Sequence, residues 1–527
     1  MSPKTLSAGK PAKPLPEPGT NNSARMKFLR RMIKPLLIFL VVFCVHVTSP
    51  NVMIADSGRS IYIASELVHH GDIVLDRYVP NWGGDPFALI NQRGHTLPLF
   101  PWAPSLFAIP LVMAWDVLHA IGVTESPFDE RIAQVGANWP FQVISMSYVV
   151  AINAVIIYYI SLRLLTELQL RRRRLAALVI TFIFAFCTPA WSTASRSLWQ
   201  HGPSMLLLSV AVLFALRARD GTLATKADQA EPRRGIARYW KPGMGNFLWL
   251  GASLAAGFAM RPTNAIPVLF FTLWVATMHT RRIIPYLAGA APVALGFFAV
   301  NRANYGSLLP PYYRGSRLGS SVDGREPDIL QALAGNVFSP GRGLFVFTPV
   351  LLLALLGTYL KVFSQVPLGL SPKNRKFHSL DVVLVASVFL HWIVISTFAH
   401  WWGGNGYGPR LFSDMVPFLV VLCIPALGYI ATLTRVPNAT HPHWPVLTCT
   451  FLLVATSFLI HFQGAYFRSS WCWNNAPVSV DDDPSRLWDW GDPQFTAGFR
   501  GFLDGVPGSL NRGIVLESGC PSDSVAG

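Results

Sequence analysis

Long apolar runs dominate this sequence and restrict its fold more than any other feature. A helix that crosses a bilayer needs about 20 mostly apolar residues. Hydrophobic residues make up 51% of the 527 positions and charged residues 13%, against about 25% charged residues in a soluble domain. Runs that could span a membrane lie near 35–50, 98–121, 141–163, 173–191, 203–217, 245–261, 263–279, 282–300, 343–363, 380–398, 411–434 and 444–463. These twelve candidates predict an all-α, polytopic membrane protein.

The basic residues between these runs indicate how the chain is oriented. Lys and Arg total 43 against 27 acidic residues, which gives a net charge of +16. Because cytoplasmic loops of membrane proteins collect Lys and Arg, the excess predicts topology and gives no reason to expect a nucleic-acid partner. Basic clusters at 171–174, 217–241, 281–282 and 361–376 are therefore assigned to the cytoplasm.

The spans alternate correctly between these loops only if one early candidate does not cross. The run 98–121 contains four prolines, and proline interrupts helical hydrogen bonding. We expect this run to be juxtamembrane or re-entrant, with a true crossing as the alternative. About eleven crossings remain, in a transmembrane domain at 35–463. A disordered basic cytoplasmic arm at 1–34 precedes it, and a short periplasmic tail at 464–527 follows it.

The predicted periplasmic segments hold nearly all residues capable of chemistry. The largest are the first loop at 51–97, the second large loop at 301–342 and the tail. Cys472 and Cys520 lie in the tail, where an oxidising compartment would allow a disulfide, and two free thiols are equally compatible. The six cysteines form no CxxC pair, so we expect no metal site from them.

The first periplasmic loop carries a carboxylate at the membrane boundary. Asp56 directly follows the first span, Arg59 comes three residues later, and Gly71-Asp72 closes the same stretch. This pattern resembles the GT-C superfamily of membrane glycosyltransferases, especially the lipid A aminoarabinose transferases and the protein O-mannosyltransferases, although Ser57 replaces their usual Glu. The resemblance implies that Asp56 is the catalytic base or orients the acceptor. The structural alternative is that Asp56 caps the following helix.

Seven cations are candidates for binding the phosphate of a lipid-linked donor. Guanidinium groups form paired hydrogen bonds to phosphate oxygens. Arg261 is preferred, since an arginine between apolar runs is costly unless it pairs with an anion, and snorkelling is the alternative. Arg93 and His95 stand where the aminoarabinose transferases carry a Lys-Pro element, and contact with lipid head groups is their alternative. The full set is Arg59, Arg93, His95, Arg261, Arg314, Arg342 and Arg410.

Aromatic and imidazole side chains beside these cations are candidates for contacts with a sugar or acceptor. Tryptophan faces suit sugar rings, and the glycines at 403–408 let backbone amides approach a ligand closely. For the adjacent tryptophans, the interfacial aromatic belt is a strong alternative. The set comprises Trp82, His201, Tyr312, Tyr313, Trp401 and Trp402.

The resemblance implies an inverting glycosyltransferase of the bacterial inner membrane, with a cytoplasmic N-terminus and a periplasmic C-terminus. It would move a sugar from a polyprenyl-phosphate donor to an envelope lipid, polysaccharide or protein. The sequence contains no Walker loop, GxSxG elbow or HExxH motif. We predict no cofactor and, with Ser57 at the second carboxylate position, no obligatory metal. The alternatives are a transporter or flippase of a lipid-linked or anionic solute, and a non-catalytic assembly subunit.

Overall fold

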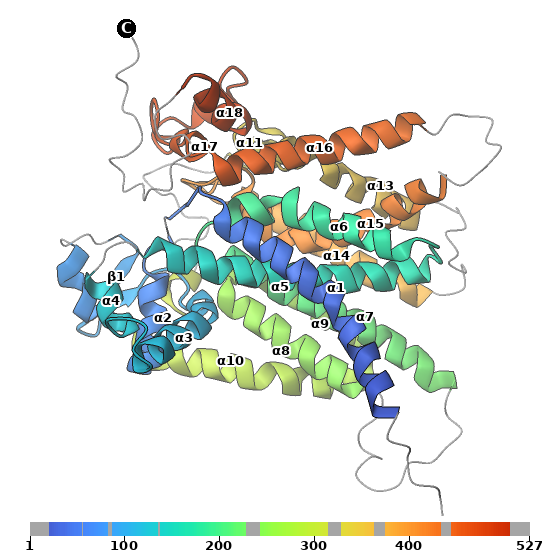
Figure 1. Ribbon diagram of the computed structural model, residues 1–527, viewed down its shortest axis with the longest axis horizontal. Helices are drawn as coiled ribbons and strands as arrows, with labels where there is room; N and C mark the ends of the chain where they lie inside the picture. Colours follow the sequence, from blue (N-terminus) through green and yellow to red (C-terminus); the bar gives the residue numbers. More distant parts are fainter. Residues whose placement is uncertain are drawn as a thin grey trace, which may run out of the picture.

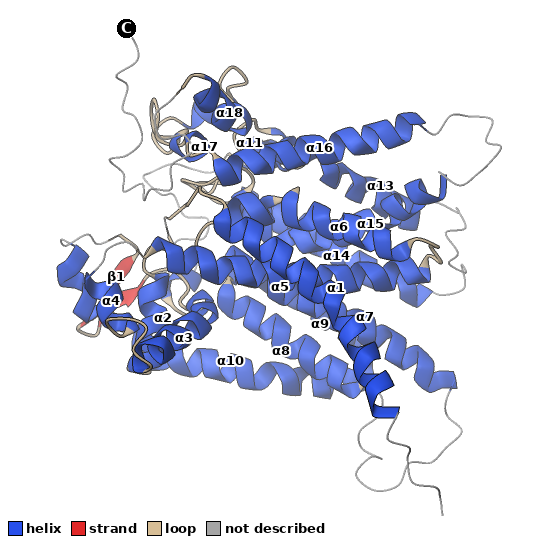
Figure 2. Cartoon of the chain, viewed as in Figure 1, coloured by secondary structure: helices blue, strands red, loops and turns tan. Residues whose placement is uncertain are grey.

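The computed structural model describes residues 20–54, 56–82, 87–134, 138–227, 243–314, 328–362, 375–433 and 444–505. Within them, nearly all regular structure is helical (Figure 2). The longer helices are α1 (Thr20–Thr48), α5 (Trp139–Glu167), α6 (Arg173–Phe186), α7 (His201–Ala227), α8 (Met244–Met260), α9 (Ala265–Met278), α10 (Ile283–Tyr305), α14 (Arg375–Ser396), α15 (Val416–Leu433) and α16 (Trp444–Tyr466). The shorter ones are α2 (Ser60–His69), α3 (Ile109–Ala120), α4 (Phe128–Gln134), α11 (Ile329–Phe338), α12 (Leu344–Phe347), α13 (Leu352–Val362), α17 (Ser469–Cys472) and α18 (Gln494–Leu503).

The helices have the length and composition of membrane spans. Among the described residues, seven helical stretches are long and apolar enough to cross a bilayer, and five more are apolar but shorter. The predicted class, an all-α polytopic membrane protein, is confirmed. The seven stretches are Ala103–Ala120, Trp139–Glu167, His201–Asp220, Thr280–Tyr305, Ser379–Ser396, Arg410–Leu433 and Trp444–Tyr466.

Three segments differ in detail from the sequence-based prediction. Helix α1 begins at Thr20, inside the stretch expected to be a disordered arm, because the residues before the span include good helix formers such as Arg, Met and Lys. The run 343–363 is divided into α12 and α13, since Pro349 cannot continue the helix that precedes it. Helix α11 lies in the second large loop, where no helix was predicted.

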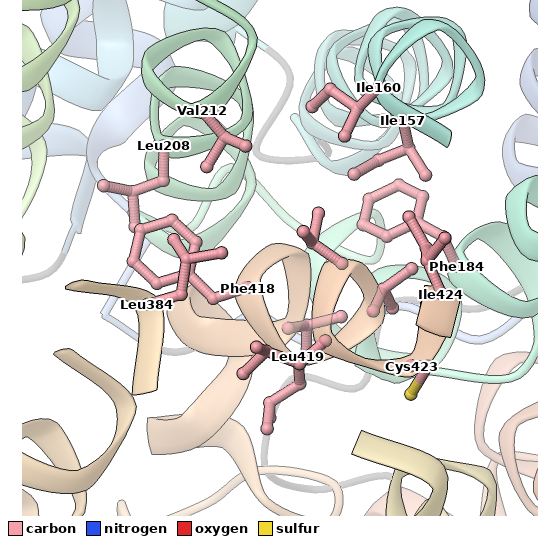
Figure 3. Close-up of a cluster of buried hydrophobic side chains, with 14 of the residues drawn as sticks. Ile157, Ile160, Phe184, Leu208, Val212, Leu384, Phe418, Leu419, Cys423 and Ile424 are labelled. Carbon is pink, nitrogen blue, oxygen red and sulfur yellow. The ribbon is translucent and has the colours of Figure 1, made fainter. Parts of the chain in front are cut away.

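Helix α15 forms the centre of the bundle, surrounded by α5, α6, α7 and α14 (Figure 3). Phe418, Leu419 and Ile424 on α15 are buried among apolar side chains of these neighbours. Inside a bilayer such packing acts through van der Waals contact, because lipid tails are as apolar as the side chains. Small residues strengthen it where backbones meet. A Cβ on Gly289 of α10 would lie 1.9 Å from the Leu248 carbonyl oxygen of α8, so only glycine allows this approach.

One end of the bundle carries both the first loop and the tail, and we call it the outer end. Figure 1 shows α2, α3, α4 and strand β1 there, together with α17 and α18. Strands β1 (Leu89–Gln92) and β2 (His95–Pro98) form an antiparallel hairpin with Gln92 opposite His95. Its two turn residues, Arg93 and Gly94, both have positive φ, as a tight type I′ hairpin turn requires.

Helix α3 belongs to the 98–121 run that was expected not to cross. By length and composition, the stretch Ala103–Ala120 could span a membrane. Its packing partners are α2 and α4 at the outer end, and Figure 1 shows it beside them. That this run is juxtamembrane or re-entrant stays a prediction, with a true crossing as the alternative.

Candidate active site

The segment that leads from α1 to Asp56 is held by a second segment that precedes α7. The fully buried Arg196 donates hydrogen bonds to the carbonyls of Ser49 (2.8 Å) and His46, and thereby caps the last turn of α1. Burial lowers the pKa of Arg196 to about 9, so the guanidinium stays charged at neutral pH. Trp199 Nε1 donates to the Met53 carbonyl at 2.6 Å. Two anchors therefore fix the chain just before the carboxylate.

Asp56 lies in the turn that leads into α2 and forms an ion pair with Arg410. Its neighbour Ser57 is hydrogen bonded to Ser197, which in turn donates to Gln142 Oε1 at 2.8 Å. The capping role considered for Asp56 has no counterpart in the described residues, where the residue at the start of α2 is Arg59 and its side chain makes no capping hydrogen bond.

A pocket opens beside this ion pair. Among its lining residues, Gln200 is 8% exposed, and its Oε1 has no hydrogen-bond partner in the described part of the chain. Tyr312 stands nearby, close enough to Asp56 and Arg410 for electrostatic interaction, and burial raises the pKa of its hydroxyl. The pocket thus combines a carboxylate, a guanidinium and an amide, and a phenol lies close to it. It is lined by Asp56, Ser57, Ser60, Phe100, Pro101, Pro104, Leu198, Trp199, Gln200 and Arg410.

Arg410 is held by several groups besides Asp56. Its guanidinium carbon lies 3.5 Å from the centre of the Trp199 ring, a cation–π contact. Its Nη1 donates to the Gly403 carbonyl at 2.9 Å, and its Nε lies 3.4 Å from His201 Nε2. Gly403 has φ +76°, a backbone conformation that favours glycine. The glycine-rich loop therefore wraps back onto the arginine that follows it.

A second ion pair lies deeper at the outer end. Asp414, in the 3-10 turn η9 (Arg410–Met415), is fully buried, and its Oδ2 is 3.0 Å from Arg261 Nε. Its Oδ1 lies 3.3 Å from His201 Nδ1. The arginine that the sequence favoured for a lipid phosphate therefore already has an anionic partner within the chain. Breaking such a pair would leave a buried charge without compensation.

The remaining predicted cations of the first loop lie elsewhere at the outer end. Arg93 is exposed and donates to the Ala303 carbonyl of α10 at 3.1 Å. His95 Nδ1 is 2.8 Å from Asp76, with both side chains about half exposed. Arg59 stacks over Trp82 at 3.9 Å from the ring centre. The partners of these groups are thus in the hairpin and its surroundings.

Two residues of the second large loop also have partners in the protein. The Arg314 side chain is exposed, and its Nε donates to a backbone carbonyl at 3.1 Å within its own loop. The Tyr313 hydroxyl is buried and donates to the Ala259 carbonyl at 2.9 Å. Of the two adjacent tyrosines, Tyr312 is therefore the one beside the pocket.

Arg342 joins the tail to the loops. It is 1% exposed and donates to Asn474 Oδ1 at 2.7 Å, to Gln494 Oε1 at 2.6 Å and to the Trp402 carbonyl at 2.9 Å. Burial lowers its pKa to about 9. This arginine is saturated by protein acceptors, which indicates a structural role.

The tail packs on the loops through tryptophans and amides. Trp402 Nε1 donates to Asp481 Oδ1 at 2.7 Å, and Trp401 is buried against α11. Gln494 of α18 also accepts from the Gly408 amide at 3.1 Å. Cys472 is disulfide-bonded, and Cys520 lies outside the described residues. The tail therefore supports the glycine-rich loop that carries Arg410.

Sequence reasoning did not assign roles to Asp414, Gln200, Trp199 or Gln494. A signal existed for the first, since an aspartate four residues after an arginine at the start of an apolar run is costly unless paired. In the described part of the chain, no group of three or more His, Cys, Asp or Glu side chains is placed to hold a metal ion.

Comparison with known proteins gives likenesses of structure. No protein-family model and no curated protein matches the chain. ArnT from Cupriavidus metallidurans bound to undecaprenyl phosphate is 14% identical, with a TM-score of 0.40, over 82% of this chain and 71% of that chain. The archaeal oligosaccharyltransferase AglB from Archaeoglobus fulgidus, in complex with an inhibitory peptide and a dolichol-phosphate, is 13% identical, with a TM-score of 0.46, over 88% of this chain and 60% of that chain.

Both proteins are less than 25% identical to this chain and have TM-scores below 0.5, so the resemblance to GT-C glycosyltransferases stays an expectation from the residues of the first loop. The likeness concerns the course of the chain in space. Substrate and mechanism have to be inferred from the residues at the outer end.

Proposed function

We propose that this chain is a membrane glycosyltransferase that moves a sugar from a polyprenyl-phosphate donor to an envelope acceptor. One observation carries the proposal: the Asp56 carboxylate meets the Arg410 guanidinium in a pocket at the outer end. Transfer from a lipid phosphate to a hydroxyl needs a base for the hydroxyl proton and a cation for the phosphate. Arg410 replaces Arg261 as the preferred phosphate ligand, because Arg261 is already paired with Asp414.

In the proposed reaction, Asp56 accepts the proton of the acceptor hydroxyl while the hydroxyl oxygen attacks the anomeric carbon of the sugar. The bond between that carbon and the phosphate oxygen breaks, and its electron pair stays on the phosphate. Arg410 stabilises the charge that develops there. Because attack and departure occur on opposite faces of the sugar ring, the anomeric configuration inverts.

The rest of the pocket supports these substrate classes. Phe100, Pro101 and Pro104 give it an apolar wall, which suits the first units of a polyprenyl chain. The free Oε1 of Gln200 can accept a hydrogen bond from a sugar hydroxyl. The proposed location is the bacterial inner membrane, with the outer end in the periplasm and the N-terminus in the cytoplasm.

Complementation of a deletion strain tests the proposal. Wild type, Asp56→Asn and Asp489→Asn are inserted at equal level, and the envelope glycans are profiled by mass spectrometry. Asp489 is an exposed carboxylate in the tail and controls for the loss of one charge at the outer end. Wild type and Asp489→Asn should restore a specific sugar that Asp56→Asn does not. Full restoration by Asp56→Asn would overturn the proposed role of this carboxylate.

A further inference from the structure

In the structure, the two groups assigned to catalysis, Asp56 and Arg410, form an ion pair with each other. Asp56 is the ionic partner of Arg410 among the described residues. A carboxylate oxygen that accepts a hydrogen bond from a guanidinium is not available to the hydroxyl of an acceptor. A guanidinium that donates to a carboxylate likewise has fewer N–H groups available to donate to a phosphate. The reaction proposed above therefore requires this pair to open.

The pair is built so that only one member can leave easily. The Arg410 side chain is 6% exposed, and the Trp199 ring and the Gly403 carbonyl hold it in place without Asp56. The Asp56 side chain is 25% exposed and lies on a turn beside the pocket. Opening of the pair is therefore expected to displace the carboxylate and to leave the guanidinium in place.

The deeper ion pair shows what a permanent pair looks like in the same region. Asp414 and Arg261 are 0% and 4% exposed, so a ligand in the pocket cannot replace either without breaking the fold. Together the two pairs balance two guanidinium groups with two carboxylates. An incoming phosphate diester, with one negative charge, can take the place of Asp56 on Arg410 while leaving the buried charges balanced.

We infer that the donor phosphate and Asp56 compete for Arg410, so that donor binding is the event that frees the base. This inference rests on the proposed function and adds an order to it. Before the donor arrives, Asp56 is engaged and cannot activate an acceptor or water. The phosphate then displaces it, and the released carboxylate faces the acceptor hydroxyl. After transfer, Asp56 releases the accepted proton to water, and its return to Arg410 as a carboxylate helps the lipid phosphate product to leave.

The inference makes a prediction opposite to that of an ordinary binding residue. Full-length protein in detergent is titrated with undecaprenyl phosphate. Asp56→Asn should bind this lipid about tenfold more tightly than wild type, because its competitor for Arg410 is gone, and tenfold corresponds to about 1.4 kcal/mol. Arg410→Gln should bind about tenfold more weakly. In the Arg410→Gln background, Asp56→Asn should bring no gain, since the carboxylate acts through this arginine.

The control and the possible outcomes separate this inference from the proposed function. Asp489→Asn removes one negative charge from the outer end without touching the pair, so its affinity should equal that of wild type. If Asp56→Asn binds no more tightly but still abolishes sugar transfer, the competition is refuted while the transferase proposal stands. If Asp56→Asn transfers sugar normally, the proposed base fails. Absence of binding in every variant overturns both the competition and the proposed donor.

Discussion

Replacing Asp414 by Asn should destabilise the whole outer end, because this residue is the buried anion beneath the pocket. Asp414 is fully buried, 3.0 Å from Arg261 Nε and 3.3 Å from His201 Nδ1. Removing one partner of a buried ion pair costs about 3–5 kcal/mol, since the other charge is left without compensation. With an unfolding entropy of about 2.1 cal/mol/K per residue, each kcal/mol lowers the Tm of a 527-residue chain by about 1 °C.

The expected result is therefore a Tm lower by about 3–5 °C. It is measured by thermal unfolding of the purified protein in detergent at one scan rate, because unfolding of a large membrane protein is often irreversible. The double variant Arg261→Gln/Asp414→Asn should lose about 1–3 kcal/mol less than the sum of the single variants. A neutral Asp414→Asn, or strictly additive losses, would refute the buried pair.

Three further predictions concern packing, the tail and pH. Gly289→Ala should cost about 1–3 kcal/mol by forcing α8 and α10 apart, whereas Gly296→Ala on the same helix, with open space around it, should leave Tm unchanged. Gln494→Leu removes an acceptor of Arg342 and should make the tail susceptible to limited proteolysis, with native resistance as the contradicting result. Burial raises the pKa of Glu66, so its contribution to stability is present at low pH and falls as pH rises through that value. Glu66→Gln should flatten this part of the profile of Tm against pH, and an unchanged profile would contradict it.

The membrane architecture could be predicted from the sequence because each span carries its own signal. A run of about 20 apolar residues is a local property. Prolines mark where a run ends, and basic loops indicate which end faces the cytoplasm. The positions where a helix is interrupted within an apolar run were harder to predict from the sequence. Pro349 divides one predicted span into two helices, and the apolar start of α11 is too short to be distinguished from a loop. The first break follows from the proline itself, whereas α11 forms only where it can pack on neighbouring helices.

The carboxylate of the candidate site could also be predicted, while its partner could not. Asp56 was identified from its place after the first span, and Arg410 was one of several arginines with equal standing. Their contact joins positions 354 residues apart. The pairing of Arg261 with Asp414 was hidden for the same reason, since it joins the residue after α8 to a residue of η9 far along the chain. Residue type and spacing define candidates, and tertiary packing selects among them.

The rival transporter hypothesis is weakened by where the charges lie. Transporters hold ionisable groups near the membrane midplane. Here Asp414 and Arg261 stand at the start of α15 and the end of α8. Lys361 and Asp381 pair at 2.7 Å near the last turn of α13. These two pairs in the described residues therefore lie near helix ends, one at the outer end and one on the side assigned to the cytoplasm.

The most direct measurement of the central claim uses purified protein in detergent, where no compartments exist. Lipid-linked sugars extracted from the deletion strain are incubated with the protein and an envelope fraction. The masses of the lipids are then measured by mass spectrometry. A transferase that uses Asp56 as its base converts polyprenyl-phosphate sugar to polyprenyl phosphate with wild type and not with Asp56→Asn. Unchanged lipid masses with wild type, or equal conversion by Asp56→Asn, would contradict the account.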